Sequence, residues 1–190
     1  MATLRFSPPH RTTKDAAILV PLVEHHGLSV LFEVRSATVR QPGEVCFPGG
    51  GMEGQESPVV CALRETEEEL GVPAASVELL GSLDPVLHMT GRTVWPFVGV
   101  IQGSLDALRL STQEVAESFL VPLTWLRKHP PQHCSYDMVP DLESVPAVLS
   151  PYVSRYRNRR NTPVWVYEGH VIWGLTARIL LEVLDHLEEG

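Results

Sequence analysis

The first hundred residues of the chain alternate between short apolar segments and polar turns. Residues 15–23 (DAAILVPLV) and 28–35 (LSVLFEVR) predict two buried strands, and the polar residues 24–27 between them predict a hairpin turn. Three more apolar stretches predict further strands: 77–80, 86–89 and 94–101. A sheet is therefore expected to form from segments on both sides of residues 36–76.

The second half of the chain has a less regular pattern. Residues 114–119 predict a short helix, and residues 120–127 predict an extended segment. Residues 128–163 combine prolines with scattered polar residues, which is typical of a long loop or an insertion. Two regular elements are expected to close the chain, a hairpin over 164–173 and an amphipathic helix over 175–187.

The best-defined element lies between these halves, over residues 58–70. Ser57 is a favourable N-cap residue, Pro58 suits the first helical position, and Gly71 suits the position after the C-terminus. A helix is therefore predicted with both of its ends fixed by the sequence. At about 100° per residue, one apolar face of this helix is expected to contain Val59, Leu63, Thr66 and Leu70.

The opposite face of this helix carries three carboxylates, Glu65, Glu68 and Glu69. Like charges at these spacings destabilise a helix by about 0.2–0.5 kcal/mol per pair, and Arg64 can offset only part of that repulsion. A solvated acidic face is the common interpretation of such a cluster. A site for a hard divalent cation is the alternative, because Mg²⁺ binds carboxylate and phosphate oxygens and the glycines at 49–51 let the backbone approach an ion.

The spacing of the residues around this helix favours the cation site. The fixed residues of the pattern are Gly50, Glu56, Arg64, Glu65, Glu68, Glu69 and Gly71. This run resembles the Nudix box, G-x5-E-x7-R-E-U-x-E-E-x-G-U, at every fixed position, with Thr66 where the family usually has a bulky aliphatic residue. The chain is therefore identified as a member of the Nudix hydrolases.

The resemblance implies an α/β fold, an α/β/α sandwich with a mixed β-sheet, and a diphosphatase that uses Mg²⁺ or Mn²⁺. Glu68 and Glu69 resemble the principal metal ligands of the family, with Glu65 nearby as a ligand or base. Gly49 would offer its backbone carbonyl to the metal, and Arg64 would orient the glutamates. In this assignment Glu56 is a supporting residue.

A second resemblance concerns the substrate and rests on residues upstream of the box. The matching positions are Arg35, Ser36, Arg40, Gly43 and the run Phe47-Pro48-Gly49-Gly50. They resemble the signature of the coenzyme A diphosphatase branch, and residues 167–178 resemble the closing hairpin and helix of that branch. The implied products are 4′-phosphopantetheine and adenosine 3′,5′-bisphosphate. The implied substrate-binding residues are Arg35, Ser36, Arg40 and Phe47.

Two assignments within this resemblance stay open. The general base is either Glu65 or Glu114, because residues 119–123 after Glu114 look like a family element; an ordinary exposed glutamate is the simpler interpretation of Glu114. The 3′-phosphate of coenzyme A has two candidate sites, the pair Arg35 and Arg40 or the arginine cluster at 155–160. For the cluster, a solvated loop is the simpler interpretation.

Composition and charge narrow the class of protein. The chain has 190 residues, 44% of them apolar, which suffices for one domain over 1–190 with residues 1–14 as an N-terminal extension. Its net charge of −8 disfavours non-specific binding to nucleic acid or to anionic membranes. Three cysteines without C-x-x-C spacing indicate neither a disulfide framework nor a zinc site. No signal peptide or membrane span is visible, so a cytoplasmic enzyme is expected.

The sequence leaves three functions open. The first is a coenzyme A diphosphatase with a small nucleotide-type substrate. The second is a Nudix hydrolase of another nucleoside diphosphate derivative, such as ADP-ribose or a dinucleotide. The third is a catalytically silent domain that only binds a ligand, against which the intact acidic cluster argues. The choice among free, oxidised and acylated coenzyme A is also open, as is the oligomeric state, with a homodimer as one option.

Overall fold

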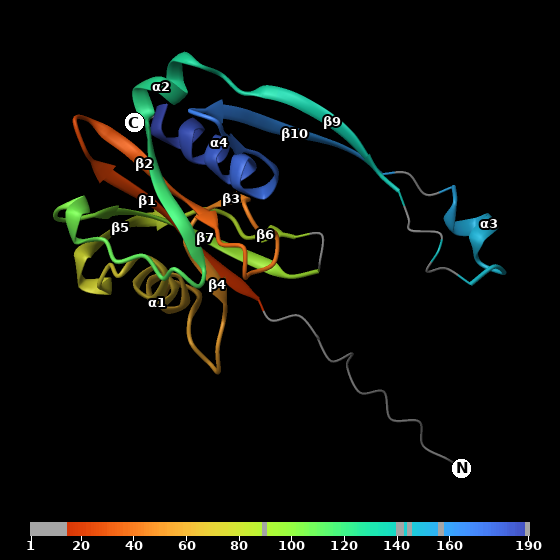
Figure 1. Cartoon of the computed structure of the whole chain (residues 1–190), viewed down its shortest axis with the longest axis horizontal. Coiled ribbons are helices and arrows are strands. Elements are labelled where there is room, and N and C mark those ends of the chain that lie inside the picture. The colour runs from red at the N-terminus through yellow and green to blue at the C-terminus, as the bar shows by residue number, and fades with distance from the viewer. Residues whose placement is uncertain (1–14, 89–90, 140–142, 144–145, 156–157, 189–190) are drawn as a thin grey trace, which may run out of the picture.

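A computed structural model gives the fold as a main sheet with helices on both faces and a smaller three-stranded sheet beside it, from which β9 and β10 extend as a ribbon (Figure 1). The structure describes residues 15–88, 91–139, 143, 146–155 and 158–188. The strands are β1 (Ala16–Glu24), β2 (Leu28–Arg35), β3 (Val45–Cys46), β4 (Gly49–Gly51), β5 (Val77–Ser82), β6 (Val86–Leu87), β7 (Thr93–Ile101), β8 (Val115–Pro122), β9 (Gln132–Met138), β10 (Asn158–Tyr167) and β11 (His170–Ile172). The helices are α1 (Pro58–Leu70), α2 (Leu123–Lys128), α3 (Ser150–Val153) and α4 (Gly174–Glu188), with 3-10 turns at Ala74–Ser76 and Leu105–Ala107.

The main sheet mixes parallel and antiparallel pairs, as expected. Its central order is β3-β2-β1-β7-β5, with β4 joined to β1, β6 to β7 and β8 to β2. β1 runs antiparallel to β2 and parallel to β7. The predicted hairpin of β1 and β2 is therefore present. The strands predicted after the box are present as β5, β6 and β7 and extend the sheet on the β1 side.

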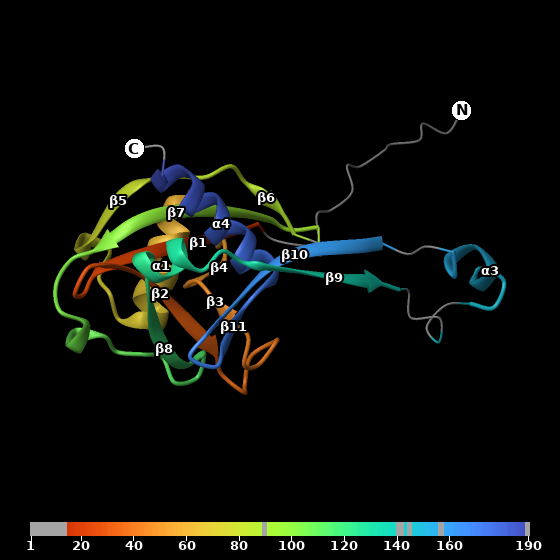
Figure 2. The same ribbon diagram turned by 90° about the horizontal axis from the view of Figure 1, so that it is seen from above.

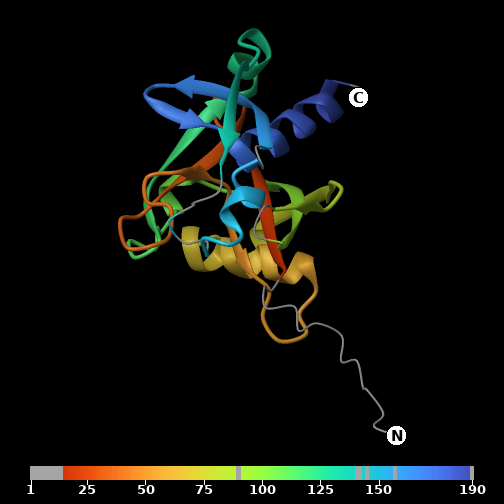
Figure 3. The ribbon, with the colours of Figure 1, turned by 90° about the vertical axis from the view of Figure 1, so that its right-hand side faces the viewer.

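Alternating residues of β1 supply two separate hydrophobic cores. Val20 and Leu22 pack in one core with Leu180 of α4, whereas Ala17 packs on the other face of the sheet with Ala62 of α1. This alternation follows from the two-residue period of a strand. Figure 3 shows α1 and α4 on opposite sides of the sheet. The α/β/α sandwich is thus confirmed.

The helix predicted over 58–70 has the predicted bounds. Gly71 adopts a left-handed conformation (φ 70°) and its N–H donates to the carbonyl of Glu67 over 2.9 Å, which ends α1. Ser57 occupies the N-cap position without a capping side-chain hydrogen bond. No helix in the part of the chain that the structure describes is long and apolar enough to cross a membrane.

The buried face of α1 agrees with the predicted one only in part. Thr66 and Leu70 are buried as predicted. Val59 and Leu63 are only half-buried, and Glu69 is buried as well. The reason is a polar contact that periodicity does not reveal, since the Glu69 carboxylate accepts the N–H of Gly49 in β4 over 2.7 Å. One of the three glutamates therefore points into the protein.

The helix predicted over 114–119 is wrong. Val115–Pro122 is a strand, β8, that pairs with the edge of β2 and places Phe119 opposite Phe32, with ring centroids 5.5 Å apart. Long-range pairing has overridden the local preference here. The extended segment predicted over 120–127 is correct only as far as Pro122, after which α2 begins.

Part of the segment 128–163, expected to be a long loop, forms regular structure. β9 pairs antiparallel with β10 from Gln132 opposite Val164 to Met138 opposite Asn158. The prolines of the segment lie outside β9, which leaves all of its backbone donors available. Figure 2 shows this ribbon extending away from the sheet. The predicted closing hairpin is present as β10 and β11, and the closing helix as α4.

The glycine at the start of β4 gives a test of how tightly this strand is fixed. Gly49 pairs with Ile18 of β1 at φ 151°, and a Cβ atom there would overlap the backbone of Ala17 and Ile18. Replacement Gly49→Ala is expected to lower the free energy of unfolding by about 2–4 kcal/mol, measured by urea denaturation. Gly54→Ala is the matched control, because Gly54 also has a positive φ (51°) but open space around its Cβ position. Equal losses in the two variants would contradict this account.

Candidate active site

Arg64 of α1 joins three carboxylates that come from different parts of the box. Its Nη2 lies 2.9 Å from Glu56 and 3.0 Å from Glu65, and its Nη1 lies 3.1 Å from Glu68. Nη2 also donates to the carbonyl of Gly51 over 3.3 Å. The hydrogen bonds from Arg64 lower the pKa of Glu56 to about 2. One guanidinium therefore holds the helix and the glycine-rich loop together.

Two further carboxylates, Glu69 and Glu33, are buried beside this group. Glu69 is 5% exposed, and burial raises its pKa to about 7, with the charge of Glu65 adding to the shift and the Gly49 N–H opposing it. Glu33 of β2 is 1% exposed, and burial together with the charge of Glu69 raises its pKa well above the ordinary value. Its Oε1 atom has no hydrogen-bond partner among the described residues. The interior here contains more carboxyl groups than the cations and N–H donors of the protein can hold in their charged form.

Glu33 was missed by the sequence analysis. Its signal is an acidic residue in the apolar strand LSVLFEVR, at a position where alternation places a side chain inside. A buried carboxyl that is only partly hydrogen-bonded requires an explanation, and an adjacent cation site supplies one.

Close approach of the glycine turn to α1 fixes Glu65. A Cβ atom on Gly50 would overlap the carboxyl group of Glu65, so a larger residue at this position would displace that carboxyl. Burial raises the pKa of Glu65, while the charge of Arg64 opposes the shift. The box glycine thus makes room for a catalytic candidate, as well as permitting the backbone to turn.

Glu114, the second candidate for the general base, lies in the turn before β8 and is exposed. Its carbonyl accepts the N–H of Ser36 over 2.8 Å, which ties this turn to the loop after β2. Burial is the main cause of the raised pKa values of Glu65 and Glu69, and the negative charge of Glu114 adds to both shifts. The structure therefore brings both base candidates to the same acidic cluster.

The donors of this cluster fit a hard cation. All are carboxylate or backbone oxygens, the type that Mg²⁺ and Mn²⁺ prefer. Within the described residues, no three of the carboxyl, thiol and imidazole groups are already grouped as an ion site. Glu65 and Glu68 instead contact Arg64, and Glu69 contacts Gly49. A cation would therefore compete with the guanidinium for the glutamates of α1.

The arginines predicted to bind substrate form a closed loop next to this cluster. Arg35 Nε donates to the carbonyl of Arg40 over 2.8 Å, and the N–H of Gly43 donates to the carbonyl of Arg35 over 2.9 Å. The Arg40 side chain is exposed and that of Arg35 is half-buried. Both can reach a ligand, although part of the hydrogen-bonding capacity of Arg35 is used within the loop.

The other two predicted substrate-binding residues are buried. Ser36 is 5% exposed, and its hydroxyl donates to the carbonyl of Gln113 over 2.5 Å. Phe47 is 4% exposed and stacks on Phe32 with ring centroids 5.0 Å apart. These side chains support the loop and the core, and the structure gives neither of them a face open to a ligand.

Comparison with known proteins agrees with the box geometry. The family model of the NUDIX domain matches residues 12–142. The chain belongs to the Nudix hydrolase family. Among its relatives are proteins named uncharacterized Nudix hydrolase NudL from Citrobacter koseri and from Escherichia coli, each 34% identical over 178 residues, or 90% of this chain and 81% of the relative.

Solved structures show the same fold at low sequence identity. A Caenorhabditis elegans Ap4A hydrolase is 19% identical, with a TM-score of 0.52 over 60% of this chain and 84% of that chain. The Nudix hydrolase RenU from Mycobacterium smegmatis is 22% identical, with a TM-score of 0.51 over 62% of this chain and 77% of that one. At these identities the likeness concerns the Nudix fold alone.

The raised pKa of Glu69 predicts a pH-dependent effect of Glu69→Gln on stability. The pKa of Glu69 is about 7 in the folded state against an ordinary 4.5. The protonated carboxyl therefore stabilises the folded state fully below pH 4.5, and this stabilisation is lost as the pH rises through 7. Glutamine stays neutral and keeps an acceptor for Gly49. In EDTA at pH 7.5 the variant should therefore be more stable to urea by on the order of 1–3 kcal/mol, and near pH 4.5 it should match the wild type.

The control for this measurement is Glu67→Gln, on an exposed position of the same helix. It should follow the wild type at both pH values. A stability difference for Glu69→Gln that does not change with pH would show that the Glu69 carboxyl titrates normally.

Proposed function

We propose that this Nudix hydrolase cleaves the diphosphate of coenzyme A or of a coenzyme A derivative, giving 4′-phosphopantetheine and adenosine 3′,5′-bisphosphate. The family supplies the hydrolytic reaction. The choice of substrate is supported by two separate segments, both similar to the coenzyme A diphosphatase branch, that line the same cavity.

These two segments line one cavity of about 480 Å³. Pro42, Gly43 and Glu44 of the upstream loop form one side of it, and Gly169 and Trp173 of the closing hairpin lie opposite. The segments are more than a hundred residues apart in the sequence. Their meeting at one cavity, next to the strand that leads into the glycine turn, is the observation that carries the proposal.

The wall of this cavity is held by an aromatic stack and a contact between histidine and carboxylate. His170 stacks on Phe119 with ring centroids 3.8 Å apart, and its Nε2 lies 2.9 Å from the Glu117 carboxylate. Trp173 offers an exposed indole beside it. A flat aromatic group near a cavity suits the adenine ring or the amide-rich pantetheine arm.

Mg²⁺ or Mn²⁺ would be held by Glu68, Glu69, Glu65 and the carbonyl of Gly49. When bound, such a cation supplies charge neutralisation for the diphosphate oxygens and makes water more acidic. Arg64 would keep the glutamates in position during this exchange of partners. Glu65 and Glu114 are the two candidates for the general base that takes the proton from the attacking water, and burial raises the pKa of Glu65 in the direction that strengthens a base.

A charge-neutral change at Glu68 tests the ligand assignment. Glu68→Gln removes one anionic donor from an exposed side chain and should lower kcat/KM by about 100-fold or more, with unchanged urea denaturation. Glu67→Gln is the matched control, since it removes the same charge from the neighbouring exposed position of α1. Activity of Glu68→Gln close to that of the control would rule out Glu68 as a ligand.

A substrate panel tests the proposal itself. With Mg²⁺ or Mn²⁺ present, the enzyme is expected to prefer coenzyme A, its disulfide or acyl-coenzyme A over ADP-ribose, NADH and diadenosine polyphosphates, by kcat/KM. Product analysis should give adenosine 3′,5′-bisphosphate. Preference for a substrate without the coenzyme A moiety would reject the proposal in favour of the second function, and no hydrolysis of any diphosphate would support a silent binding domain.

A further inference from the structure

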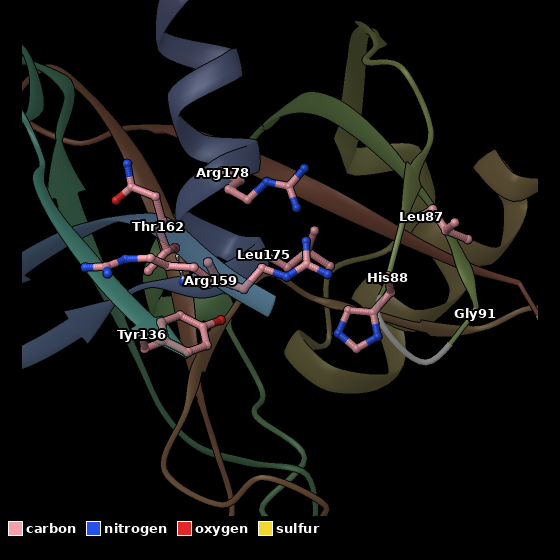
Figure 4. Close-up of a pocket in the computed structure, with 11 residues that line it drawn as sticks. Leu87, His88, Gly91, Tyr136, Arg159, Thr162, Leu175 and Arg178 are labelled. Carbon is pink, nitrogen blue, oxygen red and sulfur yellow. Dashed lines mark hydrogen bonds between the residues drawn. The ribbon is translucent and has the colours of Figure 1, made fainter. Parts of the chain in front are cut away.

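A second and larger cavity, of about 650 Å³, lies beside the start of α4 (Figure 4). Its walls are the start of α4, the β9–β10 ribbon, and Leu87, His88 and Gly91. Three arginines line it, Arg159 and Arg160 from β10 and Arg178 from α4, together with Tyr136 and His88. Neither the Nudix box nor the upstream signature includes any of these residues.

This cavity is strongly basic in a protein of net charge −8. None of its three arginines forms an ion pair with a residue that the structure describes; Asp137 lies opposite Arg159 in the ribbon but stays beyond ion-pair distance. Figure 4 shows the Arg159 and Arg178 side chains extending into the same space from β10 and from α4. Gathered cations without protein counter-charges leave this cavity with an unbalanced positive potential.

The N-terminus of α4 adds to this potential. Gly174 and Leu175, the first two residues of the helix, also line the cavity. The N–H of Gly174 donates to the hydroxyl of buried Thr162 over 3.1 Å, which fixes the helix start against β10. Helix N-termini favour anions, so the helix and the arginines act in the same sense.

His88 and Arg92 lie between this cavity and the glycine turn at Gly51. His88 lines the cavity, and its N–H donates to the carbonyl of Arg92 over 2.8 Å. The Nη1 atom of Arg92 lies about 4.0 Å from the position of a Cβ on Gly51, whose carbonyl accepts a hydrogen bond from Arg64. Arg92 therefore lies between His88 at the basic cavity and the glycine turn that Arg64 contacts.

From this arrangement we infer that the cavity binds a phosphomonoester of the substrate that is separate from the diphosphate being cleaved. Arg159 and Arg178 bind it through their planar guanidinium groups, and Tyr136 lies within the same wall. The inference rests on the proposed function, because coenzyme A carries such a group as its 3′-phosphate. It assigns the recognition of this phosphate to the ribbon and α4.

The alternative site at Arg35 and Arg40 is less suited to a dianion. Arg35 already donates to the Arg40 carbonyl. Its charge also acts on the buried Glu33 and Glu69, where it opposes the rise of their pKa values. Its charge is therefore partly compensated, whereas the charges in the basic cavity are not. Of the cluster predicted at 155–160, Arg155 follows α3 and does not line the cavity, and Arg157 lies outside the described residues.

Ligand binding without turnover tests the inference. Calorimetric titrations in EDTA, which keeps cations from the acidic cluster, compare adenosine 3′,5′-bisphosphate with adenosine 5′-monophosphate. The wild type should bind the bisphosphate about tenfold more tightly or better, and Arg178→Gln and Arg159→Gln should each remove most of that preference. Arg155→Gln is the control, because it removes the same charge from an exposed position outside the cavity. Circular dichroism checks that each variant is folded.

A kinetic comparison separates this inference from the proposed function. With coenzyme A and its 3′-dephospho form as substrates, Arg178→Gln should lower kcat/KM about tenfold for coenzyme A and leave the dephospho form nearly unchanged. Equal effects on both substrates, or a bisphosphate preference that survives in both cavity variants, would overturn the inference while leaving coenzyme A hydrolysis intact. If coenzyme A is not hydrolysed, the proposed function fails, and the titrations alone decide whether the cavity binds a phosphomonoester.

Discussion

The repulsion among buried carboxylates is the constraint on which the site depends. Burial raises the pKa values of Glu33, Glu65 and Glu69, and the charges of neighbouring glutamates add to the rise. Ionising several such carboxyl groups in the interior opposes folding. Three groups limit this cost, namely the guanidinium groups of Arg64 and Arg35 and the backbone N–H of Gly49. None of them removes it, because Glu33 Oε1 remains without a partner among the described residues. A fold that keeps such a cluster is prepared for a cation, and its stability without one should be lower at neutral pH.

The same constraint explains why the glycine turn and α1 are inseparable. Gly49 must donate its N–H to Glu69, and Gly50 must leave room for the Glu65 carboxyl, so the backbone of β4 and the side chains of the helix occupy one shared space. β4 is in turn hydrogen-bonded to β1, whose other neighbours are β2 and β7. Through these bonds the centre of the sheet fixes the position of the glutamates. Preorganisation of this kind reduces the reorganisation that catalysis would otherwise require.

What the sequence could predict follows from the range of the interactions involved. The helix over 58–70 has its start and stop signals within a few residues, and β1 and β2 are continuous apolar runs with a short turn, so local pattern was sufficient. β8 and β9 gain their backbone partners from distant strands, β2 and β10, and the local sequence of each gives no sign of this. The burial of Glu69 has the same origin: periodicity placed it on a polar face, whereas its partner, Gly49, lies twenty residues earlier.

This difference in range also separates reaction from selectivity. The groups proposed for hydrolysis lie within one contiguous motif because a rigid helix and the turn before it can place several carboxylates around an ion. The proposed substrate, by contrast, extends beyond its diphosphate on both sides, so its ends would be met by segments that only the fold brings together. The closing hairpin forms a wall of the cavity beside the upstream loop, and β10 and the start of α4 form walls of the basic cavity. Substitutions in β10, β11 or the first turn of α4 can therefore change the substrate specificity while the acidic cluster stays the same. Relatives that share the Nudix box need not share a substrate for this reason.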